Sequence, residues 1–256
     1  MNLDHNELHE LLETKYKQYN QPEFIELDPI QIPHQFTKKQ DIEIAGFLAS
    51  TLAWGKRATI LKNANLLMSW MNHAPHDFIL HFENLDLKVF ETFKHRTFNG
   101  EDCICFLKAL QQIYHQTESL ENAFFPSTLN HNIQENISNF KKLFFTLPHL
   151  NRTEKHIADP MKGSAAKRIN MFLRWMVRKD EHGVDFGIWK KIKPSELFCP
   201  LDTHSGNVAR KLGLLCRQQD DWKAVEELTA QLRLFDKDDP VKYDYALFGL
   251  GIFEKF

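Results

Sequence analysis

Two residues of this 256-residue chain have the side chains needed for covalent chemistry at a sugar or carbonyl carbon. Lys167 follows the small residues 163–166 (GSAA), and Asp202 lies 35 positions later, within residues 200–204 (PLDTH). A lysine amine can attack such a carbon and form a Schiff base, while a carboxylate can stabilise the positive charge that develops there. The structural alternative is a solvated lysine in the first turn of one helix and an aspartate that caps the next.

The segment that Lys167 opens has the periodicity of an amphipathic helix. Its apolar residues recur at i, i+3, i+4 and i+7, which is typical of a packed face: Ile169, Phe172, Leu173 and Met176. Lys167, Arg174 and Arg178 share another stripe, and a basic stripe can follow a phosphate backbone. A helix N-terminus disfavours the positive charge of Lys167 and favours the negative charge of Asp202, so we expect the two helix starts to assist the chemistry.

Helical periodicity continues through the rest of the chain, which is interrupted by only ten Gly and ten Pro. The sequence therefore predicts an all-α fold. We expect an extended connector over residues 20–36, an irregular link over 146–160, and a non-helical excursion over 179–199. The expected helices cover residues 4–18, 41–54, 58–71, from 78 onward, 102–114, 133–145, the segment after Lys167, 204–213, 222–234 and, starting at Asp239-Pro240, up to about 249.

Composition limits the class of protein. Hydrophobic content of 43% and charged content of 26% are ordinary for a soluble globular chain. The N-terminal segment is polar and acidic, and no run approaches the roughly 20 apolar residues of a membrane span, so we expect a cytoplasmic protein with no membrane partner. The four cysteines fit neither a zinc ribbon nor an iron–sulfur loop, which predicts reduced thiols and no such cofactor.

Charge is distributed unevenly along the chain. The net charge is −2, yet residues 155–193 contain ten Lys/Arg and four Asp/Glu, a local balance of +6. This asymmetry is compatible with a basic face for nucleic acid and also with an ordinary solvated helix face.

Several of these motifs resemble the helix-hairpin-helix (HhH-GPD) DNA glycosylases. Residues 163–170 (GSAAKRIN) look like the step from that superfamily's hairpin into the helix that bears its Schiff-base lysine. Residues 201–204 (LDTH) look like its motif with a catalytic aspartate. Weaker similarity covers residues 38–72 and a closing helix at 243–251. Ala165 replaces the hairpin's second glycine, and the Lys-to-Asp spacing is closest to that of archaeal 8-oxoguanine glycosylases. The chain as a whole resembles a bacterial family catalogued as domain of unknown function 2400.

The resemblance implies a fold and a set of roles. The fold would be two interleaved helical lobes with a crevice, forming one functional unit over residues 1–256. Lobe one would comprise about 1–40 and 200–256, and lobe two about 41–199, including a hairpin-like segment at 155–178. Lys167 and Asp202 would be catalytic, with supporting residues His204, Arg168 and Asn170. Expected DNA contacts are Gly163, Ser164, Arg174, Arg178, Arg210 and Lys211. Because a target base must be flipped out of the duplex, we expect an aromatic pocket at Trp54 and Trp175.

The implied activity is removal of an oxidised purine such as 8-oxoguanine from double-stranded DNA, with a possible second, strand-cleaving lyase step. The protein would act as a monomer and associate with the nucleoid while it acts. A non-catalytic protein of the same fold that binds DNA or a modified base is the alternative. A metal site is a third hypothesis, because His156/Asp159 and His182/Asp185 each have i, i+3 spacing. Both pairs fall in segments that we expect to be loops, so we predict no metal.

Overall fold

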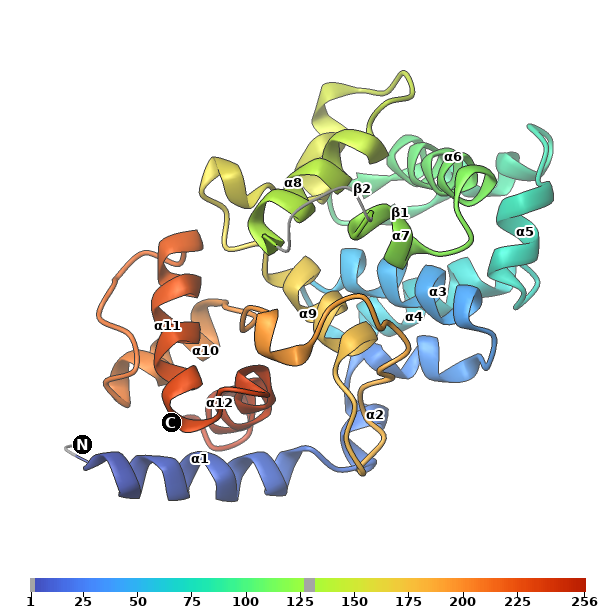
Figure 1. Ribbon diagram of the computed structural model, residues 1–256. Coiled ribbons are helices and arrows are strands. Elements are labelled where there is room, and N and C mark those ends of the chain that lie inside the picture. The colour runs from blue at the N-terminus through green and yellow to red at the C-terminus, as the bar shows by residue number, and fades with distance from the viewer. Residues whose placement is uncertain (1–2, 127–131) are drawn as a thin grey trace. The chain divides into compact units, whose positions relative to one another are not determined.

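The computed structural model of the protein describes residues 3–126 and 132–256, and regular structure in this part of the chain is almost entirely helical (Figure 1). The predicted all-α class is therefore confirmed. The described residues contain one sheet, a hairpin in which β1 (Lys94–His95) pairs antiparallel with β2 (Phe98–Asn99).

The chain divides into two compact units. Unit 1 comprises residues 1–26, 133–135 and 159–256, and unit 2 comprises residues 27–132 and 136–158. These boundaries differ from the expected lobes, because residues 159–199 belong with the two ends of the chain. The reason is a set of ion pairs that local patterns do not reveal. Arg178 binds Asp239, and Arg174 binds Asp244, so this segment is tied to the C-terminal region.

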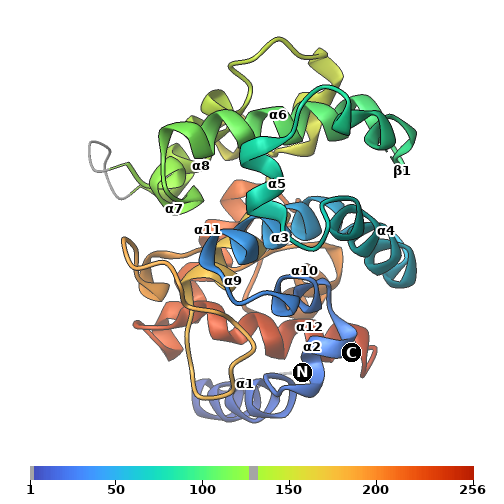
Figure 2. The same cartoon turned by 90° about the vertical axis from the view of Figure 1, so that its right-hand side faces the viewer.

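The last helix of the chain is the one against which other helices of unit 1 pack. The helices of unit 1 are α1 (His5–Tyr19), most of α2 (Glu23–Leu27), α9 (Lys167–Val177), α10 (Thr203–Lys211), α11 (Trp222–Phe235) and α12 (Asp244–Ile252). Both α1 and α10 pack against α12, as Figures 1 and 2 show for α1. The approach of α1 requires Gly249, since a Cβ atom there would lie 2.0 Å from the ring of Tyr19. Because Asp202 lies directly before α10, this packing fixes its position.

Unit 2 has an aromatic core. Its helices are α3 (Lys39–Leu52), α4 (Arg57–Trp70), α5 (Pro75–His81), α6 (Gly100–Gln116), α7 (Leu120–Phe124) and most of α8 (Ile133–Phe144). Phe124 stacks on Phe140 with ring centroids 3.6 Å apart, and Phe106 meets Phe144 at 4.8 Å. Every residue of α3 from Ile42 to Leu52 is buried, so this helix is enclosed on all sides. Core packing accounts for many of the chain's 21 Phe residues.

The expected helices correspond to observed ones within a few residues at each end. The connector over 20–36 is more ordered than expected, with α2 and two short 3-10 turns at Pro29–Gln31 and Pro33–Gln35. Neither α7 nor the β hairpin was predicted. Both are too short to produce a periodic pattern, and α7 begins at a polar side chain, Ser119, that binds a backbone N–H group.

Candidate functional site

Lys167 and Asp202 lie together in unit 1. The Nζ atom of Lys167 is 3.6 Å from Oδ2 of Asp202, and the two side chains are 26% and 35% exposed. Lys167 is the first residue of α9, and Asp202 caps α10. An amine and a carboxylate that are separated by 35 positions in the sequence therefore meet at the starts of two helices, where solvent and a ligand can reach both.

The two oxygens of Asp202 have separate partners. Its Oδ1 accepts the backbone N–H groups of His204 and Ser205 at 2.9 and 3.1 Å, while Oδ2 is the atom nearest Lys167. Burial alone raises the pKa of this carboxyl, but the charge of Lys167 and the two backbone N–H groups outweigh burial and lower the pKa below its ordinary value. Asp202 is thus an N-cap and an ionised carboxylate at the same time.

The turn before Lys167 is a tight left-handed one. Ala166 has φ 47° and ψ 36°, a conformation that costs a non-glycine residue roughly 1 kcal/mol. Asn170 stabilises this turn, because its side-chain amide donates to the carbonyl of Ala165 at 3.1 Å. Met171, one helical turn after Lys167, lies with its Sδ 3.5 Å from Nζ. The amine therefore sits between a thioether and a carboxylate, and Asn170 holds the turn that positions it.

The hairpin-like segment is exposed at Gly163 and Ser164. Gly163 has φ 86°, and its carbonyl accepts the backbone N–H of Trp222 at 3.0 Å. Ser164 forms an isolated antiparallel bridge with Asp221. The segment is therefore attached to the start of α11 while Gly163 and Ser164 stay exposed, and a phosphate contact at these two residues stays a prediction.

A second carboxylate belongs to this site and was not predicted. Asp244 opens α12, is buried, and forms an ion pair with Arg174. Burial raises its pKa to about 6, although the charges of Arg174 and Lys167 oppose the rise. Asp202 also raises the pKa of Asp244, so the two carboxylates lie close enough to interact. The sequence signal was a lone acid in the otherwise apolar run of α12.

Arg174 and Arg178 do not have the role that we expected. They are 3% and 0% exposed, and their guanidinium groups bind carboxylates inside unit 1. Arg174 binds Asp185 and Asp244. Arg178 has a set of partners that surrounds it: Asp180 at 2.8 Å, Asp185 at 3.1 Å, Asp239 at 2.8 Å and the hydroxyl of Tyr16 at 2.8 Å. Buried and engaged in this way, they cannot contact a phosphate backbone.

The expected aromatic pocket is contradicted at Trp175, whereas the role of Trp54 stays a prediction. Trp175 is completely buried in the interior of unit 1, where a flipped base cannot reach its ring. Trp54 belongs to unit 2 and is half-buried, with the guanidinium of Arg96 over its ring at 4.6 Å from the centroid.

The other predicted site residues lie on α9 and α10 and differ in their exposure and in their partners. The side chain of His204 is exposed, and its backbone N–H donates to Asp202. Arg168 is half-buried, and burial lowers the pKa of its guanidinium to about 10. Arg210 is held by Asp220 at 2.6 Å and by the carbonyl of Arg217 at 2.8 Å. Lys211 is exposed, with its amine 5.7 Å from the ring centroid of Phe256.

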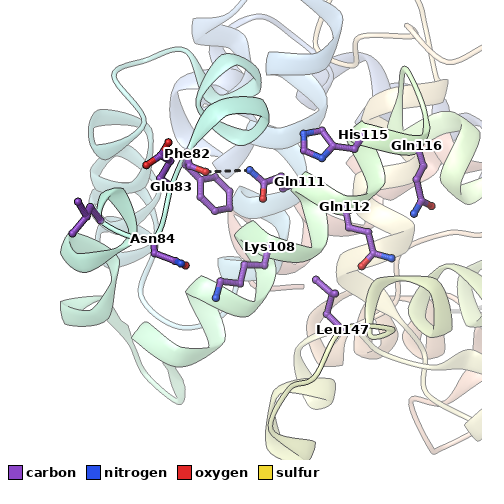
Figure 3. Close-up of a pocket in the computed structure, with 10 residues that line it drawn as sticks. Phe82, Glu83, Asn84, Lys108, Gln111, Gln112, His115, Gln116 and Leu147 are labelled. Atoms are coloured by element: carbon purple, nitrogen blue, oxygen red, sulfur yellow. Dashed lines mark hydrogen bonds between the residues drawn. The ribbon is translucent and has the colours of Figure 1, made fainter.

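Unit 2 contains a separate hollow of about 730 Å³ beside α6, lined by Phe82, Gln111, Gln112, His115 and their neighbours (Figure 3). Two of its amide side chains, Gln111 and Gln112, already have partners. Gln111 donates to the carbonyl of Phe82 at 3.3 Å, and Gln112 donates to the hydroxyl of Thr146 at 3.0 Å. The residues that line the hollow include no acid–base pair of the kind seen at Lys167, so it is a weaker candidate for chemistry.

His156, Asp159 and Asp185, which belong to the two pairs with metal-ligand spacing, have other partners. His156 is buried 3.4 Å from Asp102, and the side chain of Asp159 caps the short turn Pro160–Lys162. Asp185 binds the two buried arginines. Over the described ranges, no group of three or more His, Cys, Asp and Glu side chains is arranged to hold a metal ion. None of the helices in those ranges has the length and apolar character needed to cross a membrane.

Comparison with known proteins places the chain in a family. The fold and the site together define a class of protein: it is all-α and has a lysine–aspartate pair at the starts of two helices. The chain belongs to DUF2400, a family described as "Protein of unknown function", which it matches over residues 28–253. No curated protein and no solved structure matches it. The family match includes all the residues of the candidate site.

Proposed function

We propose that the protein is a DNA glycosylase with an associated lyase activity, which removes an oxidised purine of the 8-oxoguanine type. The observation that supports this proposal most strongly is the 3.6 Å separation between Nζ of Lys167 and Oδ2 of Asp202, with both side chains partly exposed. An amine and an ionised carboxylate at this distance can address the same sugar carbon.

In the first step, the bond between C1′ and the base nitrogen breaks. Its electron pair leaves with the base, which takes up a proton, and positive charge develops on the sugar at C1′. Asp202 stabilises this charge, because Lys167 and two backbone N–H groups lower its pKa and keep it ionised. The cap also fixes the carboxylate relative to α10, so its oxygen does not have to reorganise during the reaction.

In the second step, the amine of Lys167 gives up a proton to solvent and forms a bond to C1′. Loss of the amine protons and opening of the sugar ring yield an imine. Removal of a C2′ proton then moves electrons toward the imine and expels the 3′ phosphate, which cleaves the strand. The solvent exposure of both side chains provides a route for the released protons. Water that hydrolyses the imine regenerates the lysine.

Substrate DNA would contact unit 1 at the exposed part of this region. Gly163, Ser164 and Lys211 are exposed and remain proposed phosphate contacts. Arg174 has a different role in the proposal. It pairs with Asp244 and thereby limits the negative charge beside Asp202, which keeps Asp202 available to the substrate.

Borohydride trapping tests the proposal directly. The protein is incubated with a duplex that contains 8-oxoguanine or a preformed abasic site, and borohydride reduces any imine to a stable crosslink. We expect a crosslink with the wild-type protein and none with Lys167→Ala. Lys162→Ala is the matched control, since Lys162 is an exposed lysine of the same segment. Circular dichroism establishes that each variant is folded.

The alternative function, binding of DNA or a modified base without cleavage, predicts a different result. Lys167→Ala would then bind the duplex like the wild type, and neither protein would crosslink or cleave it. If folded wild-type protein gives no crosslink with the abasic duplex, the lyase part of the proposal is wrong. If it crosslinks to the abasic site but releases no oxidised base, the glycosylase part is wrong.

A further inference from the structure

We propose that unit 2 carries a surface that binds the phosphate backbone of a nucleic acid. This hairpin surface is defined by Trp54, Lys56, Arg57, Lys94 and Arg96. This proposal deepens the proposed function, because it names a second place where the nucleic acid binds. It rests on the proposed function only for the choice of a nucleic acid as the partner. Its geometry lies wholly within unit 2.

The centre of the hairpin surface is a stacked arginine. The guanidinium of Arg96 lies over the indole of Trp54, 4.6 Å from the ring centroid. Gly55 leaves room for this position of Arg96, since a Cβ atom there would lie 2.7 Å from Nη1 and the guanidinium would have to shift. Stacking restricts a long side chain that otherwise loses much conformational freedom when it binds a ligand. Arg96 is therefore held in place before any partner arrives.

Hydrogen bonds fix the hairpin against α4. The side-chain amide of Asn63 donates to the carbonyl of Lys94 at 3.2 Å and lies 2.9 Å from Nδ1 of His95. Nε2 of His95 is 3.3 Å from the carbonyl of Trp54. Lys56 is the N-cap of α4, the helix that carries Asn63, and therefore directly precedes its first turn. Helix α4 and β1 contact each other, so these hydrogen bonds hold Lys94 and Arg96 of the hairpin close to the start of α4.

The cations of the hairpin surface lack acidic partners. Lys56, Lys94 and Arg96 are exposed and Arg57 is half-buried. Across the part of the chain that the structure describes, none of the four lies within 4.0 Å of a carboxylate. Lys56 and Arg57 also stand at the start of α4, where the helix dipole disfavours positive charge. An anionic partner would relieve both unfavourable features.

A nucleic acid fits this surface better than an acidic peptide or a membrane. Its phosphates are regularly spaced anions, which arginine can bind with two N–H groups at once. The Arg96–Trp54 stack offers a planar group on which a base can also lie. Membrane attachment needs apolar side chains that enter the lipid. Among the described residues, the exposed large apolar ones lie elsewhere, at Leu27, Leu85, Val89, Leu150, Met161, Leu234 and Phe253.

Charge reversal tests the surface in the full-length protein. The hairpin variant replaces the four cations by Glu: Lys56→Glu, Arg57→Glu, Lys94→Glu and Arg96→Glu. The matched control reverses four exposed lysines of unit 2 that are not part of this surface: Lys88→Glu, Lys108→Glu, Lys142→Glu and Lys155→Glu. Both variants change the net charge equally. Acidic residues at the start of α4 favour the helix, so we expect the hairpin variant to fold.

Binding is measured by fluorescence anisotropy with a labelled duplex and a labelled single strand over a range of salt concentrations. We expect the hairpin variant to bind at least about tenfold more weakly at low salt. The slope of log affinity against log salt becomes shallower by about 0.7–0.9 for each phosphate that the variant no longer neutralises. The control variant keeps most of the affinity. Equally weakened binding in both variants, or binding of neither probe by the wild type, would overturn the proposal.

A second set of variants tests the stack without removing charge. Trp54→Ala and Arg96→Lys keep the cations but remove the aromatic support or the planar guanidinium. We expect weaker binding with an unchanged salt slope for both, and near wild-type binding for Trp54→Phe. If Trp54→Ala binds like the wild type, the stack has no part in binding.

The two proposals can fail separately. Wild-type protein that forms no crosslink but binds nucleic acid through the hairpin surface refutes the lyase proposal alone. A hairpin variant that binds like the wild type refutes the hairpin surface, even when Lys167 forms the crosslink.

Discussion

Asp202 has two roles that substitution can separate. As the cap of α10, it accepts two backbone N–H groups through Oδ1; as a proposed catalytic carboxylate, it presents a negative charge near Lys167. Asparagine caps helices as well as aspartate does but is neutral, whereas alanine neither caps nor carries charge. Comparing Asp202→Asn with Asp202→Ala therefore distinguishes the cap from the charge.

The expected magnitudes follow from the hydrogen bonds and the ion pair of this side chain. Asp202→Ala removes the cap and should lower the free energy of unfolding by about 1 kcal/mol, within a range of roughly 0.5–2 kcal/mol. Asp202→Asn keeps the cap and removes only an ion pair of partly exposed groups, which contributes about 0–1 kcal/mol. If the carboxylate stabilises charge at C1′, base excision by both variants should be about 100- to 1,000-fold slower.

Two assays measure these quantities. Urea denaturation gives the free energy of unfolding of each variant, and single-turnover excision from an 8-oxoguanine duplex gives the rate. Trapping on a preformed abasic site provides a control, because there the base has already left. We expect Asp202→Asn to retain this trapping through Lys167.

The result that would refute the reasoning is specific. If Asp202→Asn excises the base at the wild-type rate while Asp202→Ala is slow in proportion to its reduced stability, then Asp202 is a helix cap and nothing more. The 3.6 Å approach of Lys167 would then be an ordinary surface ion pair.

Two further predictions concern the interior of unit 1. Burial raises the pKa of Asp244 to about 6 from 3.8, so the folded protein holds this proton more tightly than the unfolded chain does. The resulting contribution to stability, about 3 kcal/mol, is complete below the unfolded pKa and disappears as pH rises through the folded pKa. Urea denaturation across this range should show that decrease in the wild type and not in Asp244→Asn; parallel curves would contradict it. Trp175→Ala should cost about 3–5 kcal/mol by the same assay, because the indole is fully buried, and a cost below about 1 kcal/mol would show an accessible ring.

The sequence predicted the helices because they depend on local signals. Apolar periodicity marks a helix, and a small-residue run or an aspartate marks its start. The closeness of Lys167 and Asp202 came from the resemblance in the motifs, since the 35 positions between them contain no local signal for it. The boundary between the units depends on ion pairs between distant positions, such as Arg178 with Asp239. Periodicity carries no information about such pairs.

The basic stripe shows why we wrongly expected Arg174 and Arg178 to contact DNA. Positions 174 and 178 lie on one face of α9, but spacing alone does not say whether that face meets solvent or protein. Asp185, Asp239 and Asp244 make this face meet protein, since together they supply the charge that two buried guanidinium groups require. Asp244 was the available signal, because an acid within the apolar run of α12 needs a cationic partner once it is buried. The two cations nearest the candidate site therefore have different roles. Arg174 neutralises buried carboxylates, and Lys167 stays at the surface beside Asp202.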